Sequence, residues 1–131
     1  MANVEKFEDL DIWIKARNLA NAIFDQTEKD RFSKDFGLKD QIQRAATSVM
    51  SNIAEGFERE GDKEFIRFLS TALGSVGEVR SQLYLAYDRN YLSEETFEEL
   101  KKCSLELTRM IKSFMRYLSE SNHEGKHYRN K

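Results

Sequence analysis

Proline is absent from this chain of 131 residues, and glycine occurs only six times. Strand-rich proteins need frequent turns, and turns depend heavily on these two residues, so their scarcity disfavours a β-sheet fold. The 34% of charged residues and the long segments of periodic apolar residues favour helices instead. The length corresponds to one domain that can bury its own core.

Cysteine is also nearly absent, because Cys103 is the only one. No disulfide can form within the chain, and a reducing cytoplasm is the expected compartment. No run approaches the roughly 20 apolar residues of a membrane-spanning helix, and the first residues include no leader-like apolar run. We therefore expect a soluble cytoplasmic protein with no membrane partner. The net charge of −2 argues against a uniformly basic surface for nucleic acid.

Four segments carry apolar residues at the three- and four-residue spacing of a helix. The predicted helices span residues 9–27, 34–58, 62–90 and 93–120. Ser33 is a candidate cap for the second helix, and Ser93 is a strong cap for the fourth because Glu94 and Glu95 follow it. Because the breaks are short, consecutive helices must be antiparallel neighbours. The sequence predicts an all-α, up-down-up-down four-helix bundle in residues 1–120 and a flexible polar tail in residues 121–131.

The second and third predicted helices each carry a line of small residues. These lines, called the small-residue seam below, consist of Ser48, Ser51, Ser70, Gly74 and Gly77. At 100° per residue, the members on the second helix lie within about 40° of Arg44, and those on the third lie within about 40° of Ser70. Two glycines inside a helix cost about 1 kcal/mol each relative to alanine, which suggests a close backbone approach. An antiparallel hairpin centred on Gly61 would bring the two lines together, with Ser48 opposite Gly74.

The same register predicts two ion pairs, Arg44 with Glu78 and Glu55 with Arg67, at the two ends of the seam. Buried pairs of this kind add little net stability but penalise a wrong register. The seam could instead pack against another copy of the chain, where small residues would again allow close packing, or it could hold a ligand. We favour the intrachain hairpin.

Positive charges gather on one side of the fourth predicted helix. They form what we call the cation stripe, which consists of Lys102, Arg109, Lys112 and Arg116. A stripe of this kind could contact the phosphates of RNA or DNA. The alternative is that cations near the carboxyl end of a helix complement its dipole, while Glu106 and Glu120 dilute the positive field.

A second line of apolar residues exceeds what one bundle seam requires. Its members, called the interface set, are Ile66, Leu73, Tyr84, Tyr87, Cys103, Met110 and Tyr117. Excess apolar surface on a small bundle indicates a subunit interface, and tyrosine and methionine are common in interface cores. The alternative is a wide core face within one chain.

Residues suited to catalysis or metal binding are few. His123 and His127 have a spacing that could hold a metal on a helix, but in a polar tail they are more simply read as unliganded. Asn52 and Glu55 are accompanied by no nucleophile, no histidine partner and no phosphate-cradling glycine loop. We expect no enzymatic activity, no metal, no cofactor and no small-molecule substrate.

Several short segments occur in a distinctive order along the chain. They are Phe7-x-Asp9-Leu10-x-x-Trp13, Phe36-Gly37-Leu38-x-x-Gln41-x-x-Arg44-Ala45-Ala46-x-Ser48, Asn52-Ile53-Ala54-Glu55-Gly56 and Gly74-Ser75-x-x-Glu78. Together they resemble the 23S rRNA-intervening sequence proteins, a family of four-helix bundles, over about residues 7–118. The ordered combination is specific, whereas any one segment alone would be weak.

The resemblance implies a ring-like homo-oligomer, typically a pentamer, with no established enzymatic activity. The family takes its name from genes that lie inside intervening sequences of large-subunit ribosomal RNA genes. A related group, the accessory proteins of diversity-generating retroelements, forms basic pentameric barrels that engage nucleic acid and a reverse transcriptase. We therefore expect a homo-oligomeric binding or scaffolding module, with RNA, DNA or a nucleic-acid enzyme as the leading partner. A protein-only assembly module is the alternative.

Overall fold

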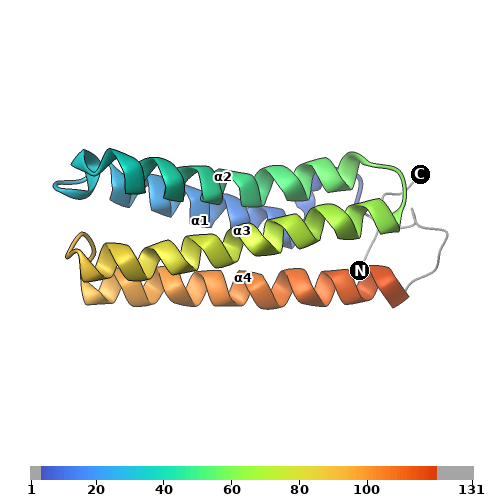
Figure 1. The fold of residues 1–131 in the computed structure, drawn as a ribbon. Helices are drawn as coiled ribbons and strands as arrows, with labels where there is room; N and C mark the ends of the chain where they lie inside the picture. The colour runs from blue at the N-terminus through green and yellow to red at the C-terminus, as the bar shows by residue number, and fades with distance from the viewer. Residues whose placement is uncertain (1–3, 121–131) are drawn as a thin grey trace.

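The computed structural model describes residues 4–120, which form a bundle of four α-helices (Figure 1). The helices are α1 (Asp11–Thr27), α2 (Phe36–Glu58), α3 (Asp62–Asp88) and α4 (Glu94–Glu120), with 3-10 helices at Phe7–Asp9 and Phe32–Lys34. Figure 1 shows successive helices running in opposite directions. The predicted all-α, up-down-up-down fold is confirmed, and each predicted helix end lies within two residues of the observed one. The predicted flexible tail lies outside the described residues.

The core runs along the whole bundle because every helix contributes an apolar stripe. The stripe of α3 is fully buried from Phe65 to Ala86, and Ile42, Val49 and Ile53 of α2 are equally inaccessible to solvent. Edge-to-face contacts between aromatic rings fill the end of the core near Gly61, where Phe65 meets both Phe57 and Phe114. No helix within residues 4–120 combines the length and apolarity needed to cross a membrane.

Polar contacts join each pair of neighbouring helices around the bundle. They are Thr27 with Gln43 (α1 and α2, 2.8 Å), Ser48 with Ser75 (α2 and α3, 2.9 Å), Arg80 with Thr108 (α3 and α4, 3.4 Å) and Lys15 with Glu106 (α1 and α4, 2.8 Å). Hydrogen bonds have strict geometry, so these contacts restrict how the helices can slide past one another.

The helix caps agree with the sequence at α4 and differ at α2. The backbone N–H of Thr96 donates to the hydroxyl of Ser93 at 3.1 Å, which confirms Ser93 as the cap of α4. The prediction of Ser33 as the cap of α2 is wrong, because Ser33 lies inside the short 3-10 helix that precedes α2. Asp35 caps α2 instead, accepting from the N–H of Leu38 at 3.1 Å.

Candidate interaction surfaces

The observed register of α2 against α3 differs from the predicted register by one residue. The hydroxyl oxygens of Ser48 and Ser75 are 2.9 Å apart, so Ser48 meets the residue next to Gly74. Further along the pair, the amide of Gln82 donates to the side-chain oxygen of Gln41 at 3.0 Å. The two contacts have the same register, so the intrachain hairpin centred near Gly61 is present.

The two predicted ion pairs between α2 and α3 are not formed among residues 4–120, so that prediction is wrong. Each charge binds a partner on its own helix instead: Arg44 binds Asp40 (2.8 Å), Arg59 binds Glu55 (2.9 Å) and Arg67 binds Glu64 (2.6 Å), while Glu78 accepts from Gln82 (3.5 Å). Partners three or four residues apart on a helix are already adjacent, so they are favoured over a residue on another helix. Because Arg44 is 77% exposed, its pair with Asp40 contributes little to stability.

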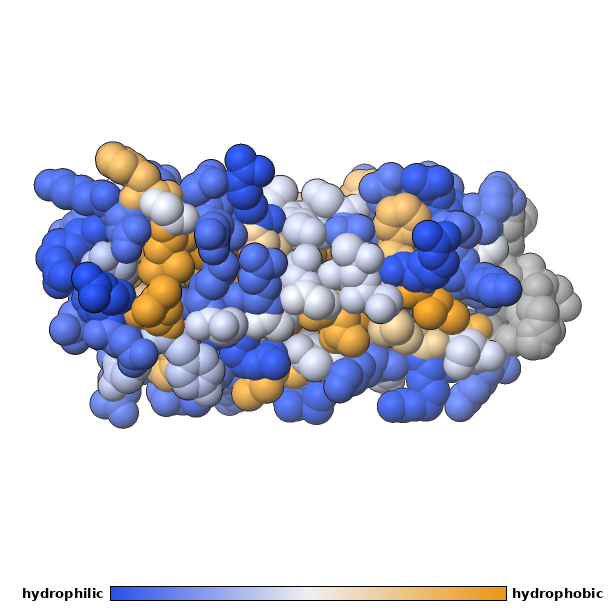
Figure 2. Space-filling model, in the orientation of Figure 1, coloured by the Kyte–Doolittle hydropathy of each residue, from blue (hydrophilic) through white to orange (hydrophobic). Residues whose placement is uncertain are grey.

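The glycines of the small-residue seam have open space around them within the protomer. A Cβ atom added at Gly74 or at Gly77 would meet, within 4 Å, no atom beyond the neighbouring residues and the nearby backbone of α3 itself. The predicted close backbone approach at these two positions is therefore absent within one chain. Ser51, Ser70 and Gly74 are exposed, and this part of the surface appears as a pale, uncharged area over α2 and α3 in Figure 2.

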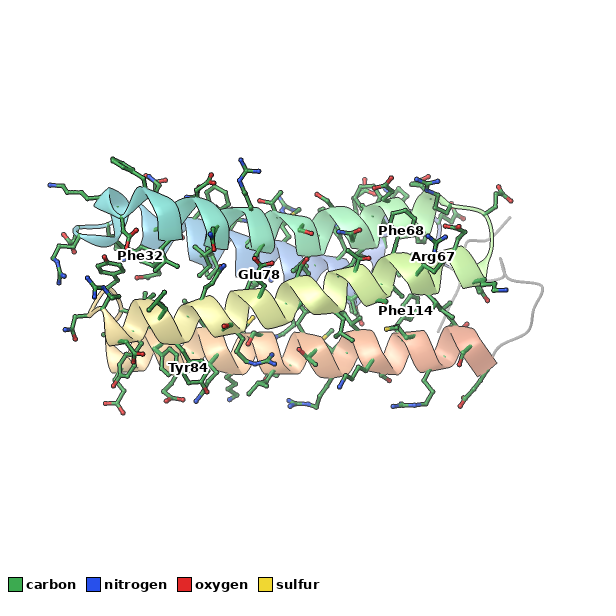
Figure 3. The ribbon with its side chains drawn as sticks, in the orientation of Figure 1. Phe32, Arg67, Phe68, Glu78, Tyr84 and Phe114 are labelled. Atoms are coloured by element: carbon green, nitrogen blue, oxygen red, sulfur yellow. The ribbon has the colours of Figure 1, made fainter. Side chains whose placement is uncertain are left out.

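The close approach of α2 and α3 occurs instead at Gly56. A Cβ atom there would lie 2.7 Å from both Phe65 Cδ1 and Phe68 Cβ, so the site has no room for a larger residue. Phe68 lies between α2 and α3 near the turn that joins them (Figure 3). Sequence reasoning missed this role, although Gly56 follows Ile53 by three residues and Val49 by seven, which places it on the core side of α2.

Most of the interface set packs against the core of its own chain. Ile66, Leu73, Tyr87, Cys103, Met110 and Tyr117 are partly buried there. Tyr84 differs, because it is 48% exposed and its ring lies edge-on to that of Phe97 at 5.0 Å (Figure 3). Burial raises the pKa of the Cys103 thiol. A wide core face accounts for the positions of the six, and a role of the set in assembly stays a prediction.

The cation stripe is exposed along the outer side of α4. None of Lys102, Arg109, Lys112 and Arg116 has an ion-pair partner among the described residues. Glu106, which was expected to dilute the positive field, accepts a hydrogen bond from Lys15 at 2.8 Å. That hydrogen bond is the main cause that lowers the pKa of Glu106, and the charges of Lys102 and Arg109 lower it further. The carboxylate therefore stays charged and offsets part of the charge of these two cations as well as that of Lys15. The cations still outnumber this carboxylate, so the stripe keeps a local excess of positive charge.

A cavity of about 510 Å³ opens beside this stripe, between the start of α1 and the second half of α4. Its apolar lining comes from Leu10, Ile12, Met110, Phe114 and Tyr117. Its polar lining comes from Asp11, Arg109 and Ser113. Arg109 thus belongs both to the cation stripe and to the cavity.

Asn52 and Glu55, the pair considered for acid–base chemistry, are engaged within α2. The amide of Asn52 donates to the backbone oxygen of Ser48 at 2.9 Å and to its hydroxyl at 3.0 Å. Glu55 binds Arg59. Residues 4–120 contain no group of three or more histidine, cysteine, aspartate or glutamate side chains arranged to hold a metal. His123 and His127 lie outside the described residues.

Comparison with known proteins identifies a family and a similar solved structure. The model of the 23S rRNA-intervening sequence protein family matches residues 8–113. A crystal structure of a protein of unknown function from the S23 ribosomal protein family of Bacteroides thetaiotaomicron is similar, with 25% identity and a TM-score of 0.74. The match covers 80% of this chain and 98% of that one. A comparison with curated proteins finds no match.

Proposed function

Because the chain belongs to the 23S rRNA-intervening sequence protein family, we propose that it is a non-enzymatic, homo-oligomeric binding module that contacts nucleic acid through the cation stripe. The observation that carries this proposal is the absence of ion-pair partners for all four cations of the stripe among residues 4–120. Arg44, Arg59 and Arg67, by contrast, bind carboxylates one turn away. Unpaired cations remain available for phosphates.

The length of the stripe fits a stretch of nucleic acid. Lys102 and Arg116 are separated by fourteen residues of α4, or about 21 Å at 1.5 Å per residue. At 3.4 Å of rise per nucleotide along each strand, this distance corresponds to about six nucleotides. Phosphate contacts of this kind supply affinity without reading the sequence of bases.

The exposed small-residue seam supports the homo-oligomeric part of the proposal. Gly74 and Gly77 lower the stability of α3, by about 1 kcal/mol each relative to alanine, and no contact within the protomer requires them. Close packing of a second copy on this face would account for both. The family resemblance suggests a cyclic pentamer, and the single cysteine fits a reducing cytoplasm.

The test is the salt dependence of binding to a structured RNA or DNA duplex, measured by fluorescence anisotropy. Four phosphate contacts predict that log K falls with log salt concentration with a slope of about −3.6. The double variant Arg109→Glu with Arg116→Glu should reduce affinity strongly and lower the slope by about 2.

A matched control places the same charge change elsewhere. Lys29→Glu with Lys34→Glu alters two exposed lysines at the connection between α1 and α2, outside the stripe. This control should bind almost as the unaltered protein does. Equal losses in both double variants would show a general charge effect, and absence of binding at low salt would refute the nucleic-acid proposal.

A protein-only assembly module is the second candidate, and large exposed apolar side chains favour it. Phe36 is 75% exposed and Leu85 is 49% exposed, and neither helps to bind phosphates. This candidate predicts the same homo-oligomer with no affinity for nucleic acid at low salt. The anisotropy measurement therefore separates the two candidates.

A further inference from the structure

We propose that the cavity between α1 and α4 accepts one unstacked base of a single-stranded nucleic acid whose phosphates lie on the cation stripe. This inference rests on the proposed function and names the kind of nucleic acid that the surface takes. It also predicts that the base carries an exocyclic amino group, as cytosine and adenine do.

The position of the cavity connects it to the stripe. Arg109 lines the cavity and is also the second cation of the stripe. Arg116 lies one residue before Tyr117, another lining residue. A strand that follows the cations along α4 therefore passes the mouth of the cavity. The positive charge of the stripe beside a mostly apolar cavity complements a ligand that combines phosphates with flat, weakly polar rings.

The shape and lining of the cavity fit a base. Its volume of about 510 Å³ exceeds the space of one base, and aliphatic and sulfur-containing side chains contact aromatic rings favourably. Met110 and Tyr117 lie about two turns apart on α4, and Leu10 and Ile12 form the facing wall. A base in a duplex is held in its stack and cannot enter, whereas a base in a single strand or a loop can be turned outwards.

The polar lining residues suggest which base is preferred. The carboxylate of Asp11 can only accept hydrogen bonds, and the amino groups of cytosine and adenine can donate them. Uracil and thymine present a carbonyl oxygen at the equivalent position, which a carboxylate repels. Arg109 and the hydroxyl of Ser113 can donate to ring nitrogens or carbonyl oxygens of the same base.

The test compares a 12-nucleotide single strand of alternating cytosine and adenine with a duplex of the same length, each made in RNA and in DNA. The variant Ser113→Trp fills the cavity from an exposed position, so it leaves the core intact. It should reduce the affinity for the single strand, relative to the duplex, by about fivefold or more, as expected for the loss of one stacked base. Ser119→Trp, an exposed serine of α4 outside the cavity, is the matched control and should keep the original ratio.

A second measurement reports directly on the base. A 2-aminopurine base carries its amino group on C2 in place of C6, so it reports on entry of the base alone. It should be shielded from quenching by acrylamide when the strand binds the unaltered protein or Ser119→Trp, but not when it binds Ser113→Trp. An oligouridine of the same length should bind more weakly than oligocytidine, and Asp11→Asn should reduce that difference.

The outcomes separate the two proposals. If neither the single strand nor the duplex binds at low salt, the proposed function fails. If both bind, and Ser113→Trp changes neither their ratio nor the shielding, the cation stripe stands and the base cavity is refuted. If the unaltered protein binds the RNA single strand more tightly than the DNA single strand, the 2′-hydroxyl takes part in recognition. Equal affinities would mean that the base and the phosphates alone supply the affinity.

Discussion

Gly56 and Gly74 differ in what surrounds them, and this difference gives a sharp prediction for single residues. The variant Gly56→Ala adds a methyl group 2.7 Å from Phe68 Cβ, which lies close to the backbone of α3 and cannot move freely. We expect it to lower the free energy of unfolding by about 1–3 kcal/mol, as overpacked cores do. Gly74→Ala has open space, so it should raise the same quantity by up to about 1 kcal/mol.

Urea denaturation followed by circular dichroism measures both changes. The comparison should be made at a protein concentration low enough that assembly does not add to the stability of the folded state. Equal effects of the two alanines would mean that helix propensity, and not the packing at Gly56, determines the result.

The charged and small residues also show where prediction from sequence stops. The helical positions of Arg44 and Glu78 were clear, but a sequence does not show which of several nearby partners a long exposed side chain will bind. Asp40 is four residues from Arg44, and the local pair wins because it requires no exact register between helices. The glycines show the same limit. A small residue indicates that close packing is possible at its position, but it does not indicate which helix or chain packs there.

At the scale of elements, Asp35 joins two connections between helices. Its carboxylate caps α2 and accepts a hydrogen bond from the hydroxyl of Tyr91, which follows α3, at 2.8 Å. The ring of Tyr91 is stacked on that of Phe32, with the ring centroids 5.0 Å apart. The hydrogen bond from the backbone of Leu38, and then that from Tyr91, lower the pKa of Asp35 in the folded protein.

A lowered folded-state pKa has a defined effect on stability. Because the folded state favours the charged carboxylate, the contribution of Asp35 is present above its pKa in the unfolded chain, about 4, and is lost as the pH falls through the lower folded value. Asp35→Asn should therefore make the loss of stability below about pH 4 less steep. The urea concentration at the midpoint of unfolding, determined from pH 7 to pH 3, measures this difference in slope. Asp25→Asn, on the exposed side of α1, is the control. A parallel loss in both variants would contradict the role assigned to Asp35.

Most of the element boundaries could be predicted, because each helix buries one continuous stripe and its ends are marked by polar breaks. Ser93 was found from the two acids that follow it, whereas Asp35 was missed because Ser33 lies inside a 3-10 turn that the sequence does not reveal. The cavity between α1 and α4 could not be predicted either. It depends on where the two helices lie relative to each other, which the periodicity of each helix does not specify.

At the scale of the whole molecule, the exposed seam predicts how copies of the chain assemble. Gly74→Leu places a large side chain on the seam, where the single protomer has room for it. The helix should persist, while close packing of a second copy is blocked. Light scattering with size-exclusion chromatography should then give the mass of one chain, 15.4 kDa, in place of a multiple of it.

Lys63→Leu is the control for added apolar surface, because Lys63 is exposed on α3 outside the seam. It should keep the mass of the unaltered protein. If Gly74→Leu also keeps that mass, the seam is not the interface, and Tyr84 or the rest of the interface set becomes the next surface to alter. A single-chain mass for the unaltered protein would refute the homo-oligomer.

The open space at Gly74 and Gly77 also sets a limit on engineering. Alanine at both positions should make the isolated chain more resistant to heat. In the proposed homo-oligomer, a redesign that selects only for thermal stability would therefore replace the residues at which two copies approach closely. Under that proposal the stability of the single chain and its capacity to assemble depend on the same two positions, so a screen for heat resistance needs a measurement of assembly beside it.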